Sequence, residues 1–263
     1  MLLLYTPAVI LPHESVQTLL ARWIPLLGHD RFYALAAVTG AAWLASLTAV
    51  LWRRLPTHAA RDALAAGWLL TVLLMLGAWQ LLSVNNSELI HFPQYAISGF
   101  LLMLLTRHGT DTLCWVTIAG TLDEAYQYAI LHPGWGIPFD FNDVYLDLLG
   151  GAAGCLLAAA FLRALPPSRP AHPWLRRPGI LLLSTTVLAG LALMPAGKLV
   201  SYADEGRGHW IALSRLRPGG FWFFDATWGP RRIHTLEPWE GPLLIAATLA
   251  AYSLLDRRHR FRP

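Results

Sequence analysis

Charged residues are scarce in this chain of 263 residues, because Lys, Arg, Asp and Glu together make up only 14% of it. An ordinary soluble domain carries about 25% charged residues, so the composition argues against a water-soluble globular protein. Hydrophobic residues account for 55% of the chain, and several apolar runs reach the roughly 17–25 residues that a helix needs to cross a membrane. We therefore expect an all-α, polytopic membrane protein.

Cysteine is also rare, with only Cys114 and Cys155, both inside predicted spans. Two cysteines in such positions do not form the framework of a disulfide-rich protein, and we interpret them as packing residues. The net charge of +4 does not indicate a nucleic-acid partner, because the arginines cluster beside apolar runs. The expected partners are membrane lipids.

The apolar runs predict a helical bundle of about seven transmembrane helices. They lie at residues 33–52, 63–83, 89–106, 112–131, 144–165, 179–197 and 241–255. The first five spans form the expected membrane core, residues 33–165. The stretch 166–178, rich in Pro and Arg, is the expected cytoplasmic linker to two further spans in residues 179–263.

Two segments are expected outside the spans. Within the N-terminal segment 1–32, residues 14–27 are typical of an amphipathic helix that lies on the outer membrane surface. The extracytoplasmic loop 198–240 contains two β-like runs around Pro218–Gly220, which predict a small β-hairpin. The predicted fold is thus a helical bundle with a small β insertion.

Basic residues are missing from two connections, NNSE at 85–88 and HPGWGIPFDFND at 132–143. The other short connections carry arginines, among them Arg53, Arg107 and those of the C-terminal stretch DRRHRFRP. The positive-inside rule predicts that these basic connections face the cytoplasm. It therefore places the N-terminus outside and the C-terminus in the cytoplasm of a multi-pass protein.

Acidic residues are concentrated in one part of the chain, since residues 84–162 contain seven acids and a single base, Arg107. Six of the acids belong to three short groups, each near the predicted outer end of a span. These groups and their polar neighbours are the candidate binding residues: Glu88, His91 and Tyr95; Asp123, Glu124 and Gln127; Asp140, Asp143 and Asp147.

The predicted depth of these groups in the membrane indicates which way their side chains face. Glu88, His91 and Tyr95 lie at i, i+3 and i+7, which places them on one helix face. Asp123 lies about 8 residues, or roughly 12 Å, from the outer end of its span. A carboxylate that faces lipid costs at least ~2.5 kcal/mol. We therefore expect the acids to face one polar pocket between three helices, open to the exterior, with His91 as their cationic partner.

The ordered set of these groups resembles the VanZ-like family of bacterial membrane proteins. The resemblance covers about residues 85–162, in the stretches ELIHFPQYAISGFLL, LDEAYQY and FDFNDVYLDLLGGAAG. Besides the polar residues it includes Phe92, Gly150 and Gly154. It implies a protein of the bacterial inner membrane that acts in the cell envelope. Through the family's namesake it also implies low-level resistance to teicoplanin, a glycopeptide antibiotic that acts outside the cell.

The sequence departs from the family pattern at two places. Many members carry an Arg after the Pro that follows the Asp-Glu helix, whereas this chain reads HPGWGIPFD there. Many members have Asn where this chain has Asp147, which makes the expected pocket more acidic. Residues 166–263 lie outside the resemblance, so it implies nothing about them.

Four kinds of function are compatible with these residues. The first is a binding protein whose outer pocket holds an envelope lipid, the headgroup of a lipid-linked precursor, or a cation. The second is an acid–base or metal-dependent enzyme with a lipid-linked substrate. Its catalytic candidates are Glu88, His91, Asp123 and Glu124. The third is a proton-coupled transporter or flippase, and the fourth is a purely structural polar network.

The enzyme hypothesis has little local support in the sequence. No metal-ligand spacing of the His-Glu-x-x-His kind is present. No Ser or Cys nucleophile has an evident base nearby, and the residues do not indicate a particular cofactor. A transporter would favour repeats and broken helices, and no internal repeat is evident.

Overall fold

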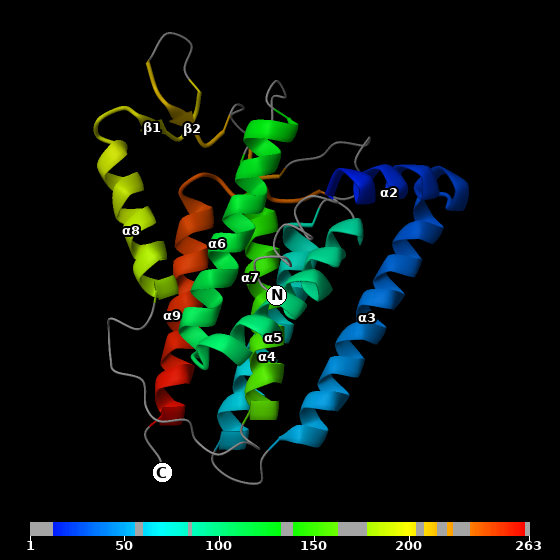
Figure 1. The fold of residues 1–263 in the computed structure, drawn as a ribbon. Coiled ribbons are helices and arrows are strands. Elements are labelled where there is room, and N and C mark those ends of the chain that lie inside the picture. The colour runs from blue at the N-terminus through cyan, green and yellow to red at the C-terminus, as the bar shows by residue number, and fades with distance from the viewer. Residues whose placement is uncertain are drawn as a thin grey trace.

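The protein was analysed as a computed structural model, which describes residues 13–55, 60–83, 86–132, 139–162, 178–203, 208–214, 220–222 and 232–260. Most of the helices run side by side as one bundle, and α2 (His13–Leu27) lies across one end of it (Figure 1). The predicted helix at residues 14–27 is thus confirmed. Its side chains Leu19, Trp23 and Leu26 are exposed, and its contact with a membrane surface stays a prediction.

A helix occupies each of the seven ranges in which a span is predicted. The helices are α3 (His29–Arg54), α4 (Ala60–Leu81), the 3₁₀ turn η1 (Asn86–Ile90) leading into α5 (His91–Thr106), α6 (Gly109–Tyr126) leading into the π-helical turn η2 (Gln127–Leu131), α7 (Phe141–Leu162), α8 (Pro178–Leu193) and α9 (Glu240–Arg260). The apolar runs therefore predict the helices correctly, with ends that differ by a few residues.

Four of these helices are long and apolar enough to cross a membrane. They cover Asp30–Arg54, Arg61–Leu81, Glu88–Thr106 and Phe141–Leu162. Helix α8 is apolar but shorter, with 16 residues. Large apolar side chains such as Val38, Leu69 and Leu188 are exposed on the outer helices, as expected of surfaces that face lipid. The protein has the character of a helical membrane protein, and the number of seven spans stays a prediction.

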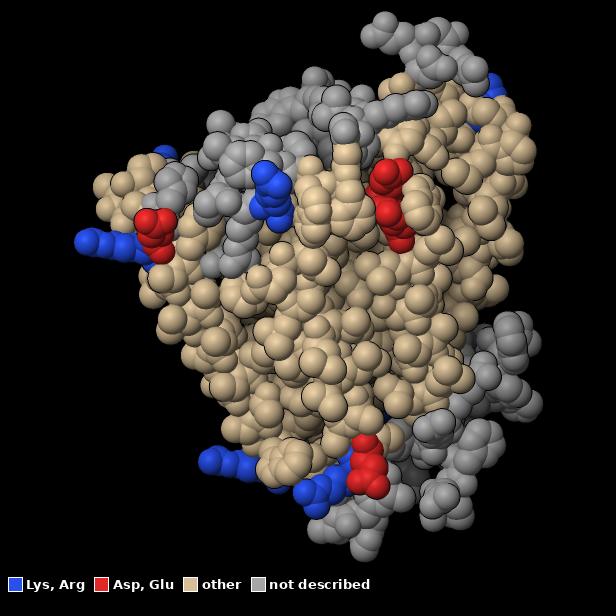
Figure 2. Space-filling view, turned by 180° about the vertical axis from the view of Figure 1, so that it is seen from behind, with Lys and Arg blue, Asp and Glu red and all other residues tan. Residues whose placement is uncertain are grey.

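The two ends of the bundle carry different residues. The exposed Arg53, Arg54, Arg61 and Arg107 lie at the end where α3 stops and α4 starts, which we call the basic end. The opposite end, where η1 leads into α5 and α7 begins, we call the acidic end. Figure 2 shows the coloured charged side chains toward the two ends of one face, with an uncharged band between them.

The segment 198–240 contains a small sheet of two strands, while the second run of the predicted hairpin, residues 221–228, lies outside the described residues except for Phe221 and Trp222. Strands β1 (Leu199–Val200) and β2 (Ile211–Ala212) pair in parallel, whereas a hairpin joins antiparallel strands. Strand β2 is also held from its other side, because Tyr128 Oη donates to the Ala212 carbonyl at 2.8 Å. The Pro218–Gly220 turn lies outside the described residues except for Gly220.

Helix α7 is the centre of the bundle, and its closest neighbour is α5. A Cβ atom added at Gly150 would lie 2.7 Å from the Phe92 carbonyl oxygen, and one added at Gly154 would overlap with the Ala96 carbonyl oxygen. Small residues therefore allow the two backbones to touch, as their spacing predicts. This close approach brings the first turns of α5 and α7 together at the acidic end.

Helix α9 packs against α4, α6 and α7, and α8 packs against α6. Polar side chains join α9 to this core: the hydroxyl groups of Tyr252 and Thr71 are 2.6 Å apart, and the Thr248 hydroxyl donates to Tyr145 Oη at 3.4 Å. The helices that follow the predicted linker therefore share one core with the preceding helices.

Candidate functional site

The nine predicted site residues all lie toward the acidic end of three helices and the turns that adjoin them. Helix α5 and η1 supply Glu88, His91 and Tyr95, α6 and η2 supply Asp123, Glu124 and Gln127, and α7 and its leading residue supply Asp140, Asp143 and Asp147. We call this set the acidic cluster. Its members belong to helices that are in mutual contact, so the structure brings the three sequence groups together.

His91 forms the centre of the acidic cluster. Its Nδ1 lies 2.8 Å from Oδ1 of Asp147, and its Nε2 lies 3.5 Å from Oδ2 of Asp143. An ionised carboxylate oxygen only accepts hydrogen bonds, so both ring nitrogens meet acceptors when they carry protons. The His91 side chain is thus placed to act as a cation between two acids of α7, which lie one helical turn apart.

Helix α6 directs its two adjacent acids to different partners. Asp123 Oδ2 accepts a hydrogen bond from the Tyr95 hydroxyl at 3.3 Å, and Glu124 Oε1 accepts one from Gln127 Nε2 at 2.8 Å. Neighbouring residues on a helix point about 100° apart, which explains why Asp123 reaches Tyr95 of α5 and Glu124 does not. Asp123 faces α5, and Glu124 is held by the first residue of η2.

Asp140 has a structural role at the start of α7. Its Oδ1 accepts hydrogen bonds from the backbone N–H groups of Asn142 at 2.9 Å and Asp143 at 3.3 Å, as an N-cap residue does. Burial, followed by the charge of Asp143, raises the pKa of Asp140 to about 7. The cap fixes the first turn of α7 and thereby the direction of Asp143.

Two oxygens of the cluster lack hydrogen-bond partners among the described residues. They are Asp123 Oδ1 and Asp147 Oδ2, and both residues are 0% exposed. Asp147 Oδ2 faces Gly120 of α6, where an added Cβ would lie 2.6 Å away. Buried polar atoms without partners are costly, so these two oxygens mark a place where a further hydrogen-bond donor would be stabilising.

The expected open pocket is a buried cluster with a partly exposed rim. His91 is 4% exposed, whereas the side chain of Asp143 is 16% exposed, and Glu88 and Asp140 are also partly exposed. The rim lies at the acidic end, because Asp143 is in the first turn of α7. A ligand that approaches from this end meets the rim carboxylates before it meets His91.

The inner side of the cluster is closed by helix packing. Val116 of α6 is 0% exposed and packs on Gly151 of α7. An added Cβ at Gly99 of α5 would overlap with the Gly151 carbonyl oxygen. The three helices therefore fill the space directly below the cluster with backbone and apolar atoms.

Metal binding receives no support from the geometry. Within the described ranges, no group of three or more His, Cys, Asp or Glu side chains is arranged to hold a metal ion. Of the predicted oxygen ligands, Asp143 and Asp147 face the two ring nitrogens of His91, and Asp123 faces the Tyr95 hydroxyl.

Asn142 is not among the predicted site residues. Its side chain connects the start of α7 to two other segments at the acidic end. Its Nδ2 donates to the carbonyl oxygens of Leu82 and His234, each at 2.9 Å, and its Oδ1 accepts from the Leu236 N–H at 2.8 Å. His234 in turn contacts Glu240 Oε2 through Nε2 at 2.7 Å. The segment that leads into α9 is therefore fastened beside the start of α7.

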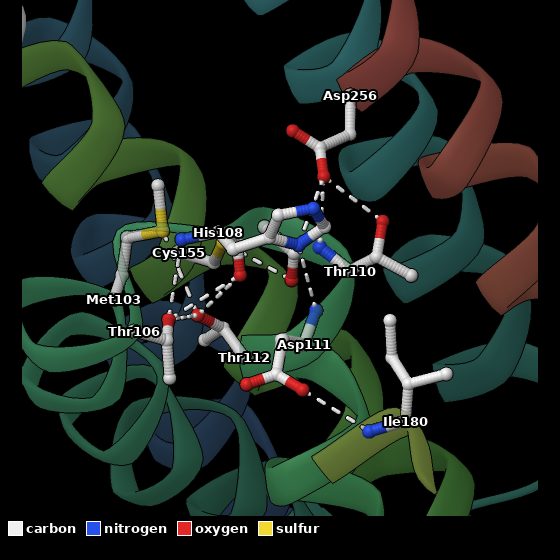
Figure 3. A network of polar contacts seen from close by, with 10 residues as sticks. Met103, Thr106, His108, Thr110, Asp111, Thr112, Cys155, Ile180 and Asp256 are labelled. Atoms are coloured by element: carbon white, nitrogen blue, oxygen red, sulfur yellow. Dashed lines mark hydrogen bonds and ion pairs between the residues drawn. The ribbon is translucent and has the colours of Figure 1, made fainter. Parts of the chain in front are cut away.

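A second polar network lies at the basic end and is not predicted from the sequence (Figure 3). Asp256 of α9 accepts hydrogen bonds from the backbone N–H and the hydroxyl group of Thr110, at 3.1 and 2.9 Å. Asp111 of α6 accepts from the Ile180 N–H at 3.0 Å. Each acid thus caps the first turn of a neighbouring helix, which fixes α6 against both α8 and α9.

His108 has two alternative roles in this network. Its Nδ1 lies 3.2 Å from the Asp111 N–H, which requires an unprotonated nitrogen, and 3.3 Å from Asp256 Oδ2, which requires a protonated one. A single nitrogen cannot serve both at once, so the presence or absence of a proton on Nδ1 decides its partner. His108 and His234 lie outside the predicted spans, yet their side chains are only 14% and 12% exposed.

Replacing Asp256 with Ala is expected to lower the free energy of unfolding by about 0.5–2 kcal/mol, the usual cost of losing a helix N-cap. Asp256→Asn keeps an acceptor oxygen and is expected to lose less. Chemical unfolding in detergent, followed by circular dichroism, measures both. Equal stability of Asp256→Ala and the wild-type protein would show that this contact does not fix α9 to α6.

Comparisons of the chain with protein family models, with curated proteins and with solved structures find no match. The resemblance to the VanZ-like family therefore stays a prediction from the sequence groups. The argument for function rests on the residues of the acidic cluster and their contacts.

Proposed function

We propose that the protein is a VanZ-like protein of the bacterial inner membrane that binds a polar group of the cell envelope at its acidic end. The basic end faces the cytoplasm in this proposal, because arginine-bearing connections are retained on that side. The acidic cluster then lies at the outer level of the membrane. Its ligand is the headgroup of an envelope lipid, that of a lipid-linked precursor, or a cation.

The observation that carries this proposal is the meeting of α5 and α7 at His91. One imidazole ring contacts Asp147 at 2.8 Å and Asp143 at 3.5 Å, while Asp123 and Glu124 approach from α6. Placing an acid inside an apolar bundle costs free energy, so such acids are functional candidates. A gradation from the buried Asp147 to the partly exposed Asp143 suits a site that receives a ligand from one side.

The contacts of His91 argue against the hypothesis of an enzyme that uses a Ser or Cys nucleophile. A general base has to reach the proton of a hydroxyl or thiol group, but both ring nitrogens of His91 already face carboxylates. Among the described residues, no Ser or Cys side chain forms a hydrogen bond with His91. Binding needs no nucleophile and fits this arrangement better.

The helix packing on the inner side of the acidic cluster argues against the hypothesis of a transporter. A transporter has to give its central site access to both sides of the membrane in turn. Here Val116, Gly151 and Gly99 close the inner side of the cluster. The arrangement of the described residues thus favours access from the acidic end only.

Replacing Asp143 with Asn tests the proposed function in cells. Expression of the wild-type protein in a teicoplanin-susceptible bacterium is expected to raise the minimum inhibitory concentration, and Asp143→Asn is expected to lose this protection. The physical reason is that the rim loses the charge that a ligand meets first, which costs about tenfold or more in affinity. Broth dilution measures the effect, and membrane fractionation checks that both proteins are present in equal amounts.

Asp62→Asn is the matched control, because Asp62 is an exposed acid in the first turn of α4 at the basic end. It is expected to protect as well as the wild-type protein. Full protection by Asp143→Asn would contradict the proposed use of the rim, and equal loss in both variants would show that the effect is unrelated to the cluster.

A further inference from the structure

We infer that the ligand of the acidic cluster carries a primary ammonium group, an inference that rests on the proposed function and names the chemistry of the group bound. The starting observation is the pair of unpartnered, fully buried oxygens, Asp123 Oδ1 and Asp147 Oδ2. They belong to α6 and α7, and the Tyr95 hydroxyl of α5 lies beside Asp123. Asp123 and Asp147 are close enough to act on each other electrostatically, so the two oxygens lie in one region where three helices meet.

The charge of the cluster determines the sign of the ligand. Six carboxylic acids gather around His91, and the only Lys or Arg between residues 84 and 162 is Arg107 at the basic end. The acids also act on one another, because Glu124 is within electrostatic range of Asp140, Asp143 and Asp147. A phosphate or carboxylate ligand would be repelled here, whereas a cation offsets the excess of negative charge.

The hydrogen-bonding atoms narrow the choice of cation. A primary ammonium group has three N–H donors and no acceptor, so it can satisfy Asp123 Oδ1 and Asp147 Oδ2 and still contact a rim carboxylate such as Asp143. A quaternary ammonium group has the same charge but no N–H, so it would leave both oxygens without partners. Donor number, and not charge alone, therefore distinguishes the expected ligand.

The position of the cluster suits an ammonium group at the membrane surface. His91 is the first residue of α5, and Asp143 is in the first turn of α7. Figure 1 shows η2, which continues α6, rising above the start of α7 at this end of the bundle. The ammonium of a lipid headgroup and a dissolved amine both reach this level.

Purified protein in vesicles of defined lipid tests this inference. Three compositions are compared: phosphatidylglycerol alone, and phosphatidylglycerol mixed with an equal amount of phosphatidylethanolamine or of phosphatidylcholine. Native mass spectrometry after gentle extraction measures which lipid stays bound. We expect phosphatidylethanolamine to be retained about tenfold or more over phosphatidylcholine, because only its headgroup brings N–H donors. Asp143→Asn is expected to reduce this preference, and Asp62→Asn is expected to keep it.

Free ethanolamine, added to protein in phosphatidylglycerol vesicles, distinguishes a dissolved amine from a lipid headgroup. A rise in the thermal unfolding midpoint with ethanolamine but not with choline supports a dissolved amine, and lipid retention without such a rise supports a headgroup.

Equal retention of phosphatidylethanolamine and phosphatidylcholine, with no response to ethanolamine, would overturn the inference. Retention of phosphatidylglycerol that depends on Asp143 would overturn it too, but would leave the proposed function standing. Retention that is independent of Asp143 in every lipid would contradict the proposed function itself.

Discussion

Replacing His91 with Ala is expected to lower the free energy of unfolding by about 3–5 kcal/mol, the usual cost of removing one partner from a buried ion pair. The loss arises because Asp147, which is 0% exposed, keeps its carboxylate but loses the contact at 2.8 Å. Asp143 loses its contact at 3.5 Å as well. Thermal and chemical unfolding in detergent measure the effect.

A double-mutant cycle with Asp147→Asn separates the lost pair from the cavity that Ala leaves. If the cost comes from an uncompensated carboxylate, the variant with both changes is expected to be less destabilised than the sum of the single changes. Additive losses would show that His91 contributes through packing alone. Loss of teicoplanin protection by His91→Ala without any loss of stability would instead favour a catalytic role for this residue.

Replacing Gly154 with Ala is expected to destabilise the protein by about 1–3 kcal/mol, as overpacking of a filled core does. The added methyl group would overlap with the Ala96 carbonyl oxygen of α5. A backbone atom cannot turn away as a flexible side chain can, so α5 and α7 must separate. Because these helices carry His91 and Asp147, we also expect the variant to lose bound lipid.

Gly77→Ala is the matched control for this prediction. Gly77 lies inside α4, and nothing is found within 4 Å of a Cβ atom added there. The same substitution is expected to be neutral or to stabilise the protein by up to about 1 kcal/mol, because Ala favours a helix over Gly. Unfolding in detergent compares the two variants, and equal effects would show that helix contact at Gly154 does not matter.

The sequence groups at residues 88–95 and 140–147 show how much of the site the local sequence pattern can predict. Helical spacing alone predicts that Glu88, His91 and Tyr95 share one face, and the connections that lack arginine predict which side of the membrane they are on. Both properties depend on neighbours along the chain, so they can be read without a structure. The partner of each acid cannot be read in this way, because His91 and Asp147 are 56 positions apart.

Two groups of contacts could not be predicted from the local sequence, for the same physical reason. Strand β2 pairs in parallel with β1, and Tyr128 of η2 holds β2 from its other side. His108 and His234 lie outside the predicted spans, yet acids of α9 contact both side chains. In each case a residue distant along the chain supplies the deciding interaction.

By itself, the sequence of this protein determined that it forms long apolar helices and that six of its acids lie toward one end of three of them. These outcomes follow from composition and helical periodicity, which are local. Only the tertiary structure decided that His91 lies between Asp143 and Asp147, that Asp123 Oδ1 and Asp147 Oδ2 lack partners among the described residues, and that Gly120 faces Asp147. Those contacts depend on how closely small residues let the helices approach and rotate against one another, which no single segment specifies.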